Sequence, residues 1–151
     1  MGSIKKVLFV CTGNSCRSIM AEGYLEKVSR ERGLGLEVCS AGTWGVEGGM
    51  PSEEAIEILE EEGVDTEKYR SKVLTSGMIK WADIILVMEP GHKEQVLAIE
   101  PEAGNKVHLL GEFTGDKGIQ DPIGMPAIVY EKCFAEIKSA VEGFVKWLEK
   151  K

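Results

Sequence analysis

The sequence of 151 residues has few cysteines and histidines and no long apolar run. Two histidines and four cysteines leave no dense set of paired ligands for a structural zinc ion. No apolar run is long enough for a signal peptide or a membrane span, so we expect a cytoplasmic protein that does not bind membranes. Lysine and arginine total 18 against 25 acidic residues, and this net charge of −7 predicts that the protein does not bind nucleic acid.

The sequence also lacks repeats, linkers and low-complexity segments, and its length suits a single domain with its own core, expected over 1–151. Apolar, β-branched runs alternate with segments in which apolar residues recur at helical spacing. This alternation predicts an α/β fold: one three-layer domain with a four-stranded parallel sheet and helices on both faces. The predicted strands are 4–10, 36–42, 83–88 and 106–110, and the predicted helices are 18–32, 52–63, 91–99 and 125–150.

The segment VLFVCTGNSCRS (7–18) places two cysteines and an arginine directly after a predicted strand. Ligands of parallel sheets bind beyond the carboxyl ends of the strands, so a site is expected in this loop. A metal site, a redox pair and an anion-binding loop around a thiolate are the possible interpretations. Four residues separate Cys11 from Cys16 and no second ligand pair follows, which disfavours zinc. We expect His92 on a solvated helix face and His108 in a strand.

The anion-binding interpretation explains more of these residues. Backbone N–H groups at a helix N-terminus, together with the helix dipole, bind a tetrahedral oxyanion without a metal. Gly13 permits a tight backbone path, and Asn14 tolerates a left-handed conformation while its side chain ties down the loop. Arg17 offers a planar fork for two phosphoryl oxygens. Cys11 is expected to be a thiolate at neutral pH, and Ser18 is expected to donate to it or to cap the helix.

A cysteine, five residues, an arginine and a serine, CTGNSCRS (11–18), resemble the signature of the low-molecular-weight protein tyrosine phosphatases. The resemblance continues through MAE (20–22), SAG (40–42), the strand DIILVM (83–88) and Asp-Pro at 121–122. It implies a phosphate-binding loop after the first strand, no cofactor and no metal. It also implies that the substrates are phosphorylated proteins, whose phosphotyrosine is hydrolysed through a phosphocysteine intermediate.

The resemblance assigns a function to residues far apart in the chain. Cys11 would attack phosphorus, Arg17 would hold the equatorial oxygens, and Asp121 would protonate the leaving group and then activate water. Ser40 would support the loop. The residues expected to bind the substrate are Thr12, Gly13, Asn14, Ser15, Cys16, Ser18 and Trp44.

Some positions depart from the family pattern and leave other activities open. Ser15 stands where the tyrosine phosphatases commonly have an apolar residue, and Ile123 and Gly124 stand where they often have aromatic residues. Both departures favour the family's protein arginine phosphatase branch as an alternative. Arsenate reduction is disfavoured because the required relay cysteines are missing after the third strand, around Met88. A phosphate-binding module without activity has no use for a thiolate and a late aspartate. Tyr69 replaces a histidine common in the network that supports the loop.

The remaining cysteines have separate interpretations. Cys16 is either a small buried residue of the loop or a partner that forms a reversible disulfide with Cys11 and protects it from over-oxidation. We favour the second possibility, which would make the protein redox-sensitive. Cys39 and Cys133 are expected in the core.

Overall fold

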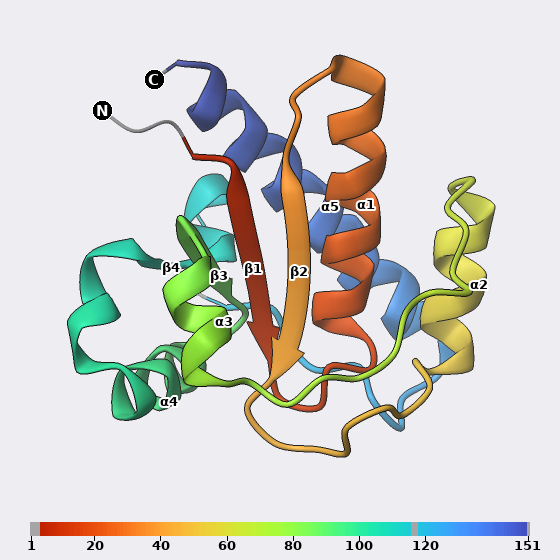
Figure 1. Cartoon of the computed structure of the whole chain (residues 1–151). Coiled ribbons are helices and arrows are strands. Elements are labelled where there is room, and N and C mark those ends of the chain that lie inside the picture. Colours follow the sequence, from red (N-terminus) through yellow and green to blue (C-terminus); the bar gives the residue numbers. More distant parts are fainter. Residues whose placement is uncertain (1–3, 116–117, 151) are drawn as a thin grey trace.

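A four-stranded parallel sheet forms the centre of the computed structural model, which describes residues 4–115 and 118–150 (Figure 1). The strands lie in the order β2-β1-β3-β4 and every neighbouring pair is parallel. Because β1 is central, its carboxyl end lies where the strand order reverses, which is the usual ligand position in such sheets. The strands are β1 (Lys6–Cys11), β2 (Glu37–Gly42), β3 (Ile84–Val87) and β4 (Val107–Leu109).

Helices cover both faces of the sheet and give the predicted three layers (Figure 1). On one face Val7 and Phe9 pack in a core with apolar residues of α1 (Arg17–Arg32), α2 (Glu53–Glu61) and α5 (Ala127–Glu149). On the other face Leu8 and Val10 pack with residues from α3 (Ser76–Trp81) and α4 (Pro90–Ile99). Short 3-10 turns, η1 (Pro101–Lys106) and η2 (Leu110–Thr114), flank β4.

The period of two explains why β1 reads as a continuous apolar run. Successive side chains of a strand point to opposite faces, and both faces of this strand are covered by helices. Val7, Leu8, Phe9 and Val10 are therefore all fully buried. The predicted α/β fold with a four-stranded parallel sheet is confirmed.

Three local predictions differ from the structure. The first helix begins at Arg17 with Cys16 as its N-cap, so Ser18 does not cap it. The sequence pattern predicts no helix between residues 64 and 82, but the structure has α3 there. Thr75 caps this helix, and its side chain accepts from Met78 N–H. This helix has only six residues, too few for an apolar period to stand out. His92 is buried, not solvated, because the first turn of α4 packs against the loop after β1.

The other expectations outside the loop are mostly met. His108 lies in β4 as predicted. Cys133 is buried in the core between α5 and the sheet, whereas Cys39 is only partly buried and packs at the edge of the other cluster. None of the helices in the described ranges is long and apolar enough to span a membrane.

Candidate active site

Residues 12–16 form a tight loop between β1 and α1, and neighbouring segments hold its backbone. Asn14 is the one non-glycine residue with positive φ in the described chain, at 53°, as its small polar side chain allows. Backbone hydrogen bonds join the loop to the segment after β2: Trp44 N–H donates to Thr12 O at 2.9 Å, and Ser52 N–H donates to Ser15 O at 2.9 Å. A Cβ at Gly42 would lie 2.5 Å from Thr12 O, so the absence of a side chain there lets β2 approach the loop.

The buried amide of Asn14 sets the direction of a hydrogen-bond chain that ends at Cys11. Asn14 Oδ1 accepts from Lys72 N–H at 2.8 Å, which identifies the opposite end of the amide as the donor. Asn14 Nδ2 donates to Ser18 Oγ at 2.7 Å and to Ser40 Oγ at 2.9 Å. Because Ser18 Oγ accepts this hydrogen bond from Asn14, the hydroxyl proton of Ser18 can point to Cys11 Sγ, which lies 2.9 Å away. This chain thus leaves the Ser18 hydroxyl free to donate to the Cys11 sulfur.

The second branch of this chain ends at a buried carboxyl group. Ser40 Oγ donates to Glu22 Oε1 at 2.5 Å. Burial raises the pKa of Glu22 to about 7, although the hydrogen bond from Ser40 opposes this shift. Tyr69 lies outside the network because its hydroxyl donates to Glu26. Two residues shortly after Tyr69 contact the loop instead. Ser71 Oγ donates to Asn14 O at 2.9 Å, and Lys72 N–H donates to Asn14 Oδ1.

The side chain of Arg17 is 1 % exposed, and its guanidinium is held on several sides. Nη1 forms an ion pair with Glu89 and donates to Ile119 O at 2.7 Å. Nη2 donates to Thr12 Oγ1 at 3.3 Å and lies 3.5 Å from Asp121 Oδ2. Nε is buried and has no partner among the described residues. A buried guanidinium N–H without an acceptor is costly, and an oxyanion bound in the loop would satisfy it.

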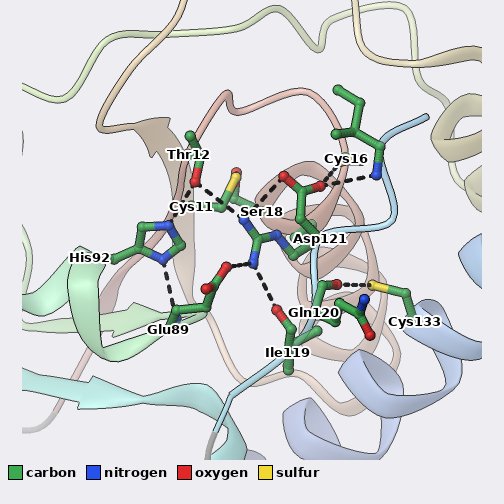
Figure 2. A network of polar contacts seen from close by, with 12 residues as sticks. Cys11, Thr12, Cys16, Ser18, Glu89, His92, Ile119, Gln120, Asp121 and Cys133 are labelled. Carbon is green, nitrogen blue, oxygen red and sulfur yellow. Dashed lines mark hydrogen bonds and ion pairs between the residues drawn. The ribbon is translucent and has the colours of Figure 1, made fainter. Parts of the chain in front are cut away.

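Asp121 lies beside this guanidinium although it comes from a distant part of the chain. Its Oδ1 accepts from Ile123 N–H at 3.1 Å and from Cys16 Sγ at 3.6 Å (Figure 2). Burial, followed by the nearby Cys11, raises the pKa of the Cys16 thiol to about 12, so the thiol keeps its proton and can donate it to the carboxylate. The segment that holds Asp121 is further attached to α5, where Cys133 Sγ donates to Gln120 O at 3.6 Å.

Two polar residues of the site were not among the predicted site residues. Glu89 pairs with Arg17, and His92 Nε2 lies 2.9 Å from Thr12 Oγ1. Both follow β3, whose carboxyl end lies next to that of β1. The sequence signal that could have revealed them is the position of Glu89 and His92 directly after a fully apolar strand, at the edge where ligands bind.

The remaining predicted residues lie in the loop or next to it. Trp44 is tied to the loop through its backbone, and the residue is 78 % exposed. Ser15 is partly buried, whereas Cys11, Asn14 and Cys16 are buried. All four cysteines are free. Within the described ranges no cluster of three or more histidine, cysteine, aspartate or glutamate residues is arranged to hold a metal.

Comparison with known proteins gives a family for this arrangement. The family described as low molecular weight phosphotyrosine protein phosphatase matches residues 6–151. A protein-arginine-phosphatase from Geobacillus stearothermophilus is 37% identical over 146 residues, which cover 95% of this chain and 96% of the relative.

Solved structures agree with this result. A low molecular weight protein tyrosine phosphatase from T. tengcongensis has a TM-score of 0.89 and 40% identity, covering 94% of this chain and 98% of that one. The YwlE arginine phosphatase, as a cysteine-to-serine mutant with a phosphorylated active-site serine, has a TM-score of 0.91 and 30% identity, covering 97% of each chain. The chain belongs to the low molecular weight phosphotyrosine protein phosphatase family.

Proposed function

We propose that this chain is a cysteine-dependent phosphatase that hydrolyses phosphotyrosine in phosphorylated proteins through a phosphocysteine intermediate. The observation that carries the proposal is the unpartnered, buried Nε of Arg17. No described group accepts a hydrogen bond from this nitrogen, and an oxyanion bound beside it would do so. Arg17 and Cys11 flank the same loop, and Cys11 Sγ lies 2.9 Å from Ser18 Oγ. A thiolate nucleophile and a guanidinium at one helix N-terminus suit attack on a phosphoryl group.

The first step of the proposed reaction forms a sulfur–phosphorus bond. The Cys11 thiolate attacks phosphorus in line while the bond from phosphorus to the leaving oxygen breaks. Asp121, protonated at this stage, gives its proton to that oxygen. Arg17 and the N–H groups of residues 12–18 hold the three equatorial oxygens, with Thr12, Gly13, Asn14, Ser15, Cys16 and Ser18 forming the binding loop.

The second step releases phosphate and restores the enzyme. Asp121, now a carboxylate, takes a proton from a water molecule as that water attacks phosphorus, and the sulfur–phosphorus bond breaks. Cys11 leaves as a thiolate, which the Ser18 hydroxyl stabilises. In the free enzyme the contact between Asp121 Oδ2 and Arg17 Nη2 is long, at 3.5 Å, and therefore weak. A phosphoryl group can replace the carboxylate at this nitrogen.

Phosphoarginine is a second candidate substrate, favoured by Ser15 and by the 37% identity to a protein-arginine-phosphatase. Ser15 brings a hydroxyl to the partly buried rim of the loop, where it can accept a hydrogen bond from a guanidinium leaving group. Ile123, 57 % exposed, follows the Asp-Pro pair without offering an aromatic surface to a phenyl ring. Trp44 is proposed as the opposite wall of the substrate pocket.

The experiment that tests the function compares turnover of a phosphotyrosine peptide and a phosphoarginine peptide. The wild type should hydrolyse the phosphotyrosine peptide, and Cys11→Ser should abolish hydrolysis. Asp121→Asn should lower kcat by about 10²-fold or more while binding persists. Full activity of Cys11→Ser would overturn the mechanism. Binding of inorganic phosphate without turnover by the wild type would favour a binding module.

Ser15→Ile decides between the two substrates in the same assay. A strong wild-type preference for phosphoarginine that collapses in this variant would make Ser15 the selector. A preference for phosphotyrosine in both proteins would show that the hydroxyl is incidental to the choice.

The same proposal extends to the domain, the location and the redox chemistry of the protein. We infer that residues 1–151 act as one phosphatase domain, that the protein is cytoplasmic, and that Cys11 and Cys16 form a reversible disulfide on oxidation. Both thiols are buried, Cys11 at the end of β1 and Cys16 at the N-cap of α1, and a reducing compartment would keep them free.

A further inference from the structure

His92 joins the first turn of α4 to the phosphate-binding loop by two hydrogen bonds. Its ring is buried, with 4 % of the residue exposed. Glu89 N–H donates to Nδ1 at 3.1 Å, and Nε2 lies 2.9 Å from Thr12 Oγ1 (Figure 2). Neither contact is needed for the mechanism above, and a buried histidine beside an active-site arginine requires an explanation.

The hydrogen bonds determine which ring nitrogen carries the proton. A backbone N–H can only donate, so Nδ1 of His92 must be the acceptor and is unprotonated. The proton of the neutral ring is then on Nε2, which donates to Thr12 Oγ1. Burial, with the charge of Arg17 as the next cause, lowers the pKa of His92, and Glu89 and Asp121 oppose this shift. The ring is therefore neutral at pH 7.

This tautomer restricts what the Thr12 hydroxyl can do. Its oxygen has two acceptor positions, and they receive His92 Nε2–H and Arg17 Nη2–H, the latter at 3.3 Å. The hydroxyl proton consequently points away from both groups and remains a donor. The same guanidinium is held at Nη1 by Glu89, the N-cap of α4. The first turn of α4 thus supports Arg17 twice, once directly and once through Thr12.

We propose that His92 is a positioning residue, whose Nε2 proton holds the Thr12 hydroxyl against Arg17 and turns the Thr12 proton toward the bound phosphoryl group. This inference rests on the proposed phosphatase function. Its alternative is a structural one, in which His92 only caps α4 through Nδ1. The two possibilities use different ring nitrogens and can be separated by two amide substitutions.

His92→Asn and His92→Gln each keep one of the two hydrogen bonds. The amide oxygen of asparagine reaches the position of Nδ1 and preserves the acceptor for Glu89 N–H, but it leaves Thr12 without a donor. The amide nitrogen of glutamine reaches the position of Nε2 and preserves the donor to Thr12, but the cap is lost. His92→Asn should lower kcat/KM for p-nitrophenyl phosphate about tenfold and weaken inhibition by inorganic phosphate about equally. His92→Gln should stay within about twofold of the wild type in both measurements while unfolding at lower denaturant concentration.

Thr12→Val supplies the second half of the test. With the hydroxyl removed, the difference in kcat/KM between His92→Asn and His92→Gln should disappear, because both act through Thr12. A difference that persists in the Thr12→Val background would overturn the proposal. The reverse order, with His92→Asn active and His92→Gln impaired, would also overturn it, because that result is expected if His92 only caps α4 through Nδ1. The matched control is His108→Asn on β4, which should leave the kinetics unchanged.

The tautomer can be measured without any variant. Nitrogen NMR of the wild-type imidazole should show Nδ1 unprotonated and Nε2 protonated at pH 7. A proton on Nδ1 would overturn the proposal even if neither His92 variant folds. A wild type that binds phosphate but hydrolyses no phosphomonoester would instead overturn the proposed function, and phosphate affinity would still compare the two His92 variants.

Discussion

Replacing Asn14 tests whether one buried amide holds the phosphate-binding loop. The side chain is fully buried and makes three hydrogen bonds, with Ser18, Ser40 and the backbone of Lys72. Each is worth about 1 kcal/mol, and an alanine held at the left-handed φ of 53° costs about 1 kcal/mol more. Asn14→Ala should therefore lower the free energy of unfolding by roughly 4 kcal/mol.

Urea unfolding followed by circular dichroism measures this loss, and one further variant separates its two causes. Asn14→Gly removes the same hydrogen bonds but adopts positive φ freely, so it should be about 1 kcal/mol more stable than Asn14→Ala. The control is Asn105→Ala in η1, an exposed position where the change should stay within about 0.5 kcal/mol. If Asn14→Ala unfolds at the same urea concentration as Asn105→Ala, with the same dependence on urea, the hydrogen-bond chain does not stabilise the loop.

Three other predictions concern a titration, a close backbone approach and an oxidation. Since burial raises the pKa of Glu22 from 4.5 to about 7, the folded state holds this proton more tightly than the unfolded state, and stability falls as pH rises from 4.5 to about 7. Glu22→Gln should reduce the fall in the free energy of unfolding over this pH range by up to about 3 kcal/mol. An unchanged dependence of that free energy on pH would contradict the role given to Glu22. Gly42→Ala, whose Cβ would meet Thr12 O at 2.5 Å, should weaken phosphate affinity in calorimetry about tenfold or more, whereas Gly77→Ala, with 3.8 Å of room, should not. Peroxide-treated wild type should regain activity with dithiothreitol, whereas Cys16→Ser should not; equal recovery would rule out a protective disulfide.

Much of the candidate site could be predicted because it is contiguous in the chain. One apolar strand, one loop and one helix carry Cys11, Asn14, Arg17 and Ser18, and their spacing alone places them around a helix N-terminus. The left-handed conformation of Asn14 and the contact of Ser18 with Cys11 follow from this local geometry, and both expectations are confirmed. The expected cap at Ser18 was wrong because the helix begins one residue earlier, at Arg17, and such boundaries depend on small differences in energy.

The burial of His92 and its contact with Thr12 could not be read from sequence pattern. An isolated histidine in a short helix with little apolar periodicity is typical of a solvated face. The structure buries it because β3 pairs directly with β1, so the turn that follows β3 meets the loop that follows β1. Tyr69 is a similar case, since its hydroxyl is directed to Glu26 on α1 and the neighbouring Ser71 and Lys72 contact Asn14 instead.

The sequence by itself determined the α/β fold class and the position of the loop proposed to bind an anion, because strand and helix periods and the order Cys-x5-Arg act over a few residues. Only the tertiary structure revealed Glu89 on Arg17 and His92 on Thr12, and only it placed Asp121, which the family resemblance had already assigned to the site, beside Cys16. Asp121 and Cys16 are 105 positions apart along the chain. Contacts at such separations are set by the strand order β2-β1-β3-β4 and by the packing of α4 and α5, which the local periods do not encode.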